Sequence, residues 1–185
     1  MTREHLRFKT KIARGSILHC FVVDCSGSML SQQQLALAQG ALLQLHQRAY
    51  QQRADIALIS YAGKAAIVHI RPTAARPFNA GQLISTPPLI NTLSTLRGGG
   101  GTPFARGIAT ANALLAENRR RKPEQQSWLW LLSDGRSNET PERPSAADVL
   151  IIIDCEQQRI ALNRCRTLAE AWRADYQTLD DWLLP

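Results

Sequence analysis

The sequence predicts an α/β domain: a doubly wound, mostly parallel sheet with helices on both faces and one antiparallel edge strand. Three observations lead to this fold class. Strand-like and helix-like stretches alternate along the 185 residues. The strand candidates are apolar throughout, as are strands buried on both faces. The strand candidates that end near residues 24 and 133 run directly into Asp24 and Asp134, where a turn begins.

The first half of the chain is expected to contain three strands and one long helix. Ile17–Asp24 forms the central strand, and residues 55–61 form a second. Residues 65–70 follow Gly63 and are expected to be a hairpin partner at the sheet edge. The helix spans residues 31–50, because apolar side chains recur there at helical spacing: Leu35, Ala38, Leu42, Leu45 and Ala49.

The second half continues the alternation. A helix over residues 104–118 begins just after Pro103, which suits the first turn of a helix. Residues 128–133 and Val149–Asp154 are expected to be buried strands. The remaining elements are two helices, over residues 89–96 and 161–174, and an edge strand over residues 176–179.

Charge and cysteine usage limit the class of protein. The net charge is +7, with basic residues spread over the lead-in and over residues 119–122. The second cluster suits the end of a helix, and no aromatic residue is interleaved with it, which argues against a nucleic-acid partner. Four cysteines without a CxxC pair, and no apolar run that could cross a bilayer, indicate a cytoplasmic protein without a membrane partner. We expect one domain over residues 1–185, with a basic lead-in over residues 1–15.

Oxygen-bearing side chains stand at three junctions between elements: Asp24, Ser26 and Ser28; Thr102; and Asp134. Carboxylates and hydroxyls are ligands of hard cations. The carboxyl ends of parallel strands meet at the switch point in strand order, where ligands bind. The sequence therefore predicts a metal site, with Mg²⁺ as the first choice and Mn²⁺ or Ca²⁺ as alternatives. Taken alone, the first stretch also fits a helix N-cap.

The same residues resemble the metal-ion-dependent adhesion site of the von Willebrand factor A domain. The family's Asp-x-Ser-x-Ser, Thr and Asp elements are present in order and without substitution. The resemblance implies that the hydroxyls hold Mg²⁺, that the carboxylates hold metal-bound waters, and that an acidic residue of a partner protein completes the coordination. Contacts to that partner are expected from these residues: Gly101, Pro103, Arg136, Arg120 and Arg121.

A narrower resemblance covers nearly the whole chain. Residues 6–9, 21–29, 98–103 and 133–138 are similar to the C-terminal domain of the D subunit of magnesium and cobalt chelatases. This implies a subunit that is not catalytic alone and that couples an AAA+ ATPase to metal insertion into a tetrapyrrole, with the large chelatase subunit as a further partner. The sequence has no GxxxxGKS or GxxxxGKT phosphate loop, so the ATPase is expected to be a separate chain.

Two alternatives stay open. The domain could serve an AAA+ ATPase of the MoxR type in the assembly of another complex, with the same metal site and a different partner. More remotely, a strand followed by Asp24 is similar to the start of Mg²⁺-dependent phosphotransferases. Ser26, however, stands where such enzymes place a second carboxylate, which removes the general acid.

Two connections depart from a regular alternation. About ten residues separate Asn138 from Val149, whereas a helical crossover between parallel strands needs roughly a dozen or more. We therefore expect the crossover helix to be missing or reduced to a turn, which would leave one sheet face partly bare and open to a partner. Residues 72–88 are rich in proline and are expected to form a loop next to the metal site.

Overall fold

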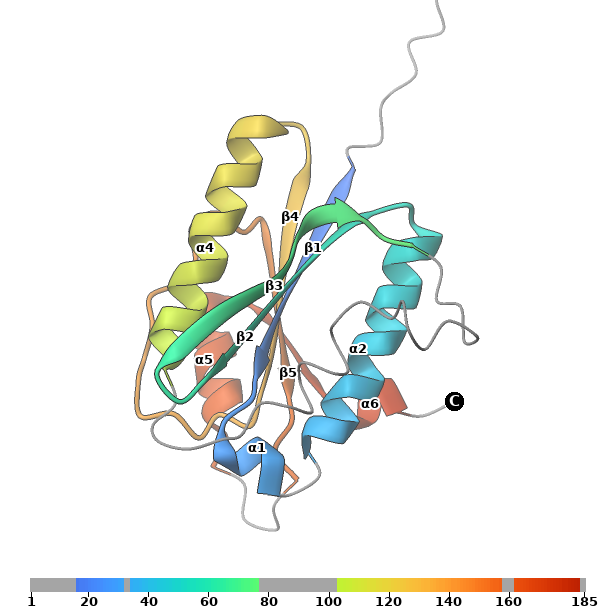
Figure 1. Ribbon diagram of the computed structural model, residues 1–185. Coiled ribbons are helices and arrows are strands. Elements are labelled where there is room, and N and C mark those ends of the chain that lie inside the picture. Colours follow the sequence, from blue (N-terminus) through green and yellow to red (C-terminus); the bar gives the residue numbers. More distant parts are fainter. Residues whose placement is uncertain (1–15, 32–33, 77–102, 158–161, 184–185) are drawn as a thin grey trace, which may run out of the picture.

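The computed structural model describes residues 16–31, 34–76, 103–157 and 162–183, and these form a six-stranded sheet between two helical layers (Figure 1). The strand order is β3-β2-β1-β4-β5-β6. All neighbouring pairs are parallel except β2 with β3, which confirms the predicted fold class. The strands are β1 (Ile17–Asp24), β2 (Asp55–Ala62), β3 (Ala65–Ala74), β4 (Gln126–Ser133), β5 (Val149–Asp154) and β6 (Asp175–Thr178).

Helices cover both faces of the sheet (Figure 1). The helix expected over residues 31–50 is observed as α2 (Gln34–Gln51), and a short helix that was not predicted, α1 (Gly27–Ser31), comes before it. They share one face with α6 (Asp180–Leu183), while α4 (Phe104–Arg121) and α5 (Arg164–Trp172) cover the other. The helix predicted over residues 89–96 and most of the loop predicted over residues 72–88 lie outside the described residues.

Two apolar layers enclose the sheet, and β1 contributes to both. Its side chains alternate, so that Phe21 and Val23 join the layer under α2 while Cys20 and Val22 join the layer under α4. Each of these four side chains is at most 2% exposed. A strand with both faces buried in this way needs apolar residues at every position, which is why its sequence does not alternate.

The connection between β4 and β5 contains no helix over residues 134–148, as predicted. It runs along α4 instead: the Ala146 N–H donates to Asn112 Oδ1 at 2.8 Å, and Arg119 forms an ion pair with Asp148. The expectation of a partly bare sheet face is wrong. The sheet side chains beneath it, such as Leu131 and Ile152, are fully buried, because the extended connection packs into the apolar layer between α4 and α5.

A buried histidine links β1 to β4 and to the turn that follows α2. Trp130 Nε1–H donates to His19 Nδ1 at 3.0 Å, and His19 Nε2 lies 3.1 Å from Gln52 Oε1. Because indole nitrogen only donates, Nδ1 must accept, and the ring proton belongs on Nε2, which donates to Gln52. The neutral ring therefore satisfies both contacts. A second ring proton would point at the Trp130 N–H, and burial lowers the pKa of His19.

We expect the stability of the protein to fall as the pH drops below the unfolded-state histidine pKa of about 6.5. A lowered folded pKa means that the unfolded state takes up the proton first, so the stabilisation is complete above that pH and is lost toward the folded pKa. Burial lowers the pKa of His46 and His69 in the same direction. Urea unfolding at pH 7.5 and 5.5 tests this. His19→Gln should show a smaller loss than the wild type, and equal losses would contradict the assignment.

Candidate metal centre at the carboxyl edge of the sheet

Two aspartates meet where the strand order reverses. β1 lies between β2 and β4, so the chain leaves it in opposite directions across the sheet. Asp24 is the last residue of β1, and Asp134 directly follows β4. Both carboxylates are buried, at 0% and 1% exposure. They are close enough that the charge of Asp134 contributes to raising the pKa of Asp24. The structure thus brings these two predicted site residues together at the switch point, where ligands of such sheets bind.

The turn after β1 holds two serine hydroxyls next to Asp24. Asp24 Oδ1 accepts the Ser26 N–H at 2.8 Å, which closes the turn in the way that a helix cap does. The Ser26 and Ser28 hydroxyl oxygens lie 3.1 Å apart. Ser26 is buried, and Ser28 is half-buried. One aspartate oxygen therefore closes the turn, and the two hydroxyls face one another beside it.

Ser133 and Tyr61 belong to the site, although neither was singled out from the sequence. The Ser133 hydroxyl donates to Asp24 Oδ2 at 2.8 Å and accepts the Gly135 N–H at 3.1 Å. Tyr61 stands opposite Asp24 in the register of β1 and β2, and burial together with the Asp24 charge raises the pKa of its hydroxyl. The available signal was positional, since both residues stand at the carboxyl end of a strand adjacent to β1.

The two carboxylate oxygens of Asp134 differ in their hydrogen bonding. Its Oδ1 accepts the Arg136 N–H at 3.0 Å. Its Oδ2 is buried and accepts no hydrogen bond from the part of the chain that the structure describes, with Arg136 Nε 3.9 Å away. A buried carboxylate oxygen without a hydrogen bond is costly. A cation or its bound water would satisfy it.

The electrostatics of the site favour a cation. Burial raises the pKa of Asp24, and the nearby charge of Asp134 adds to this rise. Two close carboxylates in a buried position repel one another unless a positive charge lies between them. Among the described residues, no group of three or more His, Cys, Asp or Glu could hold a metal ion. A cation here would therefore depend on the serine hydroxyls as well as the two aspartates, a donor set that suits a hard ion.

The other predicted site residues fall in three places. Gly101 and Thr102 lie outside the described residues. Pro103 directly precedes α4 and lines one groove together with Arg136. Arg120 and Arg121 are in the last turn of α4, at the top of Figure 1, whereas Asp24 ends β1 toward the bottom. A helix rises 1.5 Å per residue, which separates Arg120 from Pro103 by about 25 Å.

Glu139 caps the helix that begins next to the site. Pro103, at the N-cap of α4, makes no side-chain capping hydrogen bond. Instead the Ala105 N–H donates to Glu139 Oε2 at 2.7 Å. A carboxylate at this end of a helix also interacts favourably with the helix dipole. The connection after β4 therefore holds the first turn of α4 in place.

Replacing Glu139 with alanine is expected to lower the free energy of unfolding by about 1 kcal/mol, the usual cost of losing a helix cap. Glu139→Gln keeps an acceptor oxygen and should lose less. Urea unfolding measures both. Glu142→Ala is the matched control, since Glu142 is an exposed carboxylate on the same connection that caps no helix. A control loss as large as that of Glu139→Ala would contradict the capping role.

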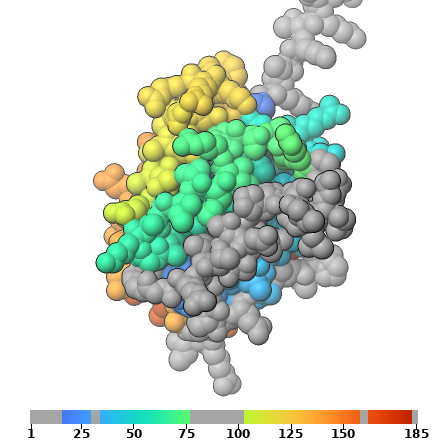
Figure 2. Space-filling view, in the orientation of Figure 1, coloured from blue at the N-terminus to red at the C-terminus, as the bar shows by residue number. Residues whose placement is uncertain are grey.

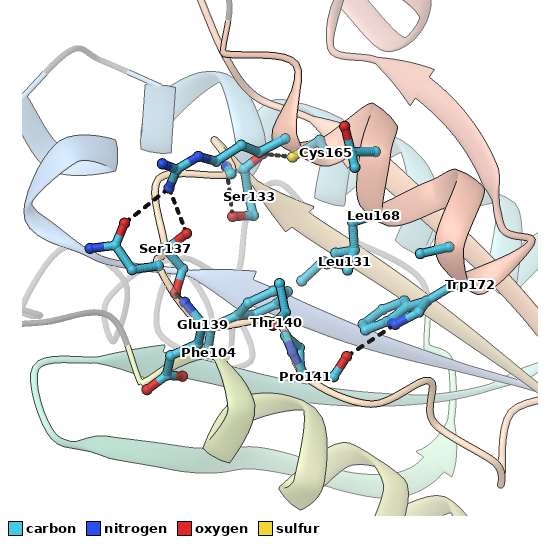
Figure 3. A pocket seen from close by; sticks show the side chains of 15 residues that line it. Phe104, Leu131, Ser133, Ser137, Glu139, Thr140, Pro141, Cys165, Leu168 and Trp172 are labelled. Atoms are coloured by element: carbon cyan, nitrogen blue, oxygen red, sulfur yellow. Dashed lines mark hydrogen bonds between the residues drawn. The ribbon is translucent and has the colours of Figure 1, made fainter.

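A second, apolar cavity of about 340 Å³ lies between the β4–β5 connection and α5 (Figure 3). Phe104, Leu131, Leu168 and Trp172 form its apolar lining. The Trp172 Nε1–H donates to the Pro141 carbonyl at 3.2 Å, which ties the connection to α5. The lining of the cavity also includes Ser133 and Gly135, which stand on either side of Asp134 in the chain.

Comparison with known proteins agrees with the geometry. Residues 20–136 match the family model described as the von Willebrand factor type A domain. An uncharacterised protein of Mycobacterium tuberculosis is 29% identical over 177 residues, 90% of this chain and 27% of that protein. The magnesium-chelatase 67 kDa subunit of Chlorobaculum tepidum is 32% identical over 136 residues, 74% of this chain and 20% of the subunit. The chain therefore spans between 20% and 27% of the length of these two relatives.

Solved structures agree on the fold. A von Willebrand factor type A protein from Catenulispora acidiphila superposes with a TM-score of 0.60 at 17% identity, over 89% of this chain and 38% of that one. At this identity the likeness concerns the fold alone. Separately, none of the described helices is long and apolar enough to cross a membrane.

Proposed function

Because the chain belongs to the von Willebrand factor type A family and resembles the D subunit of magnesium chelatases, we propose that it is a Mg²⁺-dependent protein-interaction subunit. One observation carries the proposal. Two buried aspartates converge at the switch point of the sheet beside a pair of serine hydroxyls 3.1 Å apart, and one aspartate oxygen has no hydrogen-bond partner among the described residues.

The hydroxyl and carboxylate side chains would have different roles in holding the ion. Ser26, Ser28 and Thr102 would supply neutral hydroxyl ligands, while Asp24 and Asp134 would hold metal-bound waters. When bound, Mg²⁺ supplies an open position that a carboxylate of a partner protein can fill. The chain's own part is to keep these oxygens in place: the Ser26 N–H and the Ser133 hydroxyl fix both oxygens of Asp24. Mn²⁺ or Ca²⁺ would use the same ligands.

The partner that we propose is an AAA+ ATPase subunit of the chelatase type, with the large chelatase subunit as a further contact. The similarity to magnesium-chelatase subunits supports this choice. The domain would not be catalytic alone and would couple the ATPase to metal insertion into a tetrapyrrole. Four buried free cysteines support a reducing, cytoplasmic setting.

Two measurements test the proposal. Mg²⁺ titrated calorimetrically into protein freed of metal should bind to the wild type and not to the double variant Ser26→Ala, Ser28→Ala. Immobilised protein should then capture a chelatase-type ATPase from a lysate of the source organism in Mg²⁺ but not in EDTA. Capture of a different AAA+ ATPase would keep the site and change the partner. Absence of Mg²⁺ binding would overturn the metal-dependent mechanism.

A further inference from the structure

A basic groove of about 820 Å³ lies directly beside the candidate metal centre. Three elements form it: the turn between β2 and β3, the first turn of α4, and the connection after β4. Its charged residues are Lys64, Arg106, Arg136 and Glu139. Figure 2 shows the end of the β2–β3 hairpin in green beside the start of α4 in yellow-green, at the lower left of the molecule.

Cations predominate in the basic groove. Lys64 and Arg106 are exposed, and the side chain of Arg136 is 30% exposed. Arg106 NH1 donates to the Lys64 carbonyl at 2.6 Å, so the guanidinium is held in place by a neutral group and keeps its charge available. Glu139 is the single carboxylate among the described lining residues, and it is engaged with the Ala105 N–H. The basic groove therefore carries three cationic side chains and one carboxylate that is already hydrogen-bonded.

The basic groove continues from the metal centre. Arg136 lines the groove, and its Nε lies 3.9 Å from Asp134 Oδ2, so the groove adjoins the aspartate pair. A carboxylate bound at the centre would place the next residues of its own chain among these cations. In an extended chain alternate side chains point the same way, about 7 Å apart. Acidic residues at alternate positions of that chain could thus meet Arg136 and then Arg106 or Lys64.

We propose that the basic groove binds an extended acidic segment of the partner protein, adjoining the residue that coordinates the metal. This proposal rests on the proposed function, because it takes the metal centre as the fixed end of the contact. Charge complementarity selects the occupant. The described lining contains no aromatic side chain on which a nucleic-acid base could stack. An acidic peptide fits the groove better than a nucleic acid of the same charge.

The test uses a fluorescently labelled hexaglutamate peptide and fluorescence anisotropy, in Mg²⁺ and in EDTA. The double variant Lys64→Gln, Arg106→Gln should bind the peptide about tenfold more weakly than the wild type. The matched control is Arg120→Gln, Arg121→Gln, which removes the same charge from the far end of α4 and should change the affinity less than about twofold. Thermal unfolding of both variants checks that the fold is retained.

Several outcomes would overturn the proposal: equal losses in both double variants, no binding of hexaglutamate to the wild type, or equally tight groove-dependent binding of an eight-nucleotide oligothymidine. Comparing Mg²⁺ with EDTA, and the wild type with the variants, also distinguishes the metal centre from the basic groove. Peptide binding that requires Mg²⁺ but not the groove cations keeps the metal centre and removes the groove. Binding that requires the groove cations but is unchanged in EDTA keeps the groove and removes the metal bridge.

Discussion

Replacing Asp24 with asparagine is expected to lower the affinity for Mg²⁺ by about 10- to 100-fold, without loss of stability in the metal-free protein. The charged carboxylate is what the ion requires. The folded protein alone does not require it, since the carboxylate is fully buried and burial raises its pKa. Removing a buried charge while keeping the shape of the side chain relieves a desolvation cost.

The contacts around Asp24 allow this substitution. The asparagine oxygen can still accept the Ser26 N–H, which closes the turn. The Ser133 hydroxyl now donates to Asp24, and it can rotate to accept from the new amide instead. We therefore expect the free energy of unfolding without metal to be unchanged or higher. Asp24→Ala would remove both contacts, so a loss of Mg²⁺ affinity could not be distinguished from a loss of stability.

Asp154→Asn is the matched control for this experiment. Asp154 ends β5 just as Asp24 ends β1, is 7% exposed, and accepts the Glu156 N–H at 2.9 Å in the same type of turn. Its second oxygen accepts the Tyr176 hydroxyl at 2.8 Å. Calorimetric titration of Mg²⁺ should show unchanged affinity for this variant. Equal losses in both variants, or none in Asp24→Asn, would show that the aspartate pair is not the metal centre.

Gly107→Ala is expected to be the most destabilising of the small substitutions, costing about 3 kcal/mol through overpacking. A Cβ atom at this position would lie 2.5 Å from Cδ1 and 2.9 Å from Cγ of Tyr61. Tyr61 is 1% exposed, and its ring packs against Phe104 with centroids 5.7 Å apart. The ring therefore has little room to move, and α4 would have to shift away from β2.

Intrinsic helix propensity predicts the opposite sign, because alanine in a helix is favoured over glycine by about 1 kcal/mol. A measured loss would therefore identify the close approach of α4 to Tyr61 as its cause. Thermal unfolding should show a midpoint about 10 °C lower. Gly27→Ala is the control, since a Cβ at Gly27 meets nothing within 4 Å. A Gly107 variant as stable as the Gly27 variant would contradict the packing argument.

The strands were the most predictable part of the fold. β1 and β5 have the predicted boundaries, Ile17–Asp24 and Val149–Asp154, and the edge strand expected over residues 176–179 is observed at Asp175–Thr178. Continuous apolar runs identify such strands because both of their faces are buried. Helix ends were less predictable. The short α1 (Gly27–Ser31) was not predicted, because its apolar residue Met29 joins the same layer as Leu35 of α2 without a helical pattern of its own.

The site was predictable as a set of residue types, while its contacts were not. The meeting of Asp24, Ser26 and Asp134 could be predicted, because these oxygen-bearing residues follow strands whose carboxyl ends lie at one edge of the sheet. The roles of Ser133 and Tyr61 could not, because they depend on which strands are neighbours and on their register. The distance between the site and Arg120 could not be predicted either. It depends on the direction of α4, whose first turn lies near the site and whose last turn lies at the opposite end of the strands.

By itself, the sequence determined the fold class, the central strand and the position of two aspartates at strand ends. These depend on local composition, because apolar runs are buried and turns follow them. The tertiary structure alone decided that Ser133 holds Asp24 from 109 positions away, that Glu139 caps α4 across 34 positions, and that Lys64, Arg106 and Arg136 line one groove. Contacts of this kind depend on sheet order and helix packing, which bring together residues that no local pattern relates.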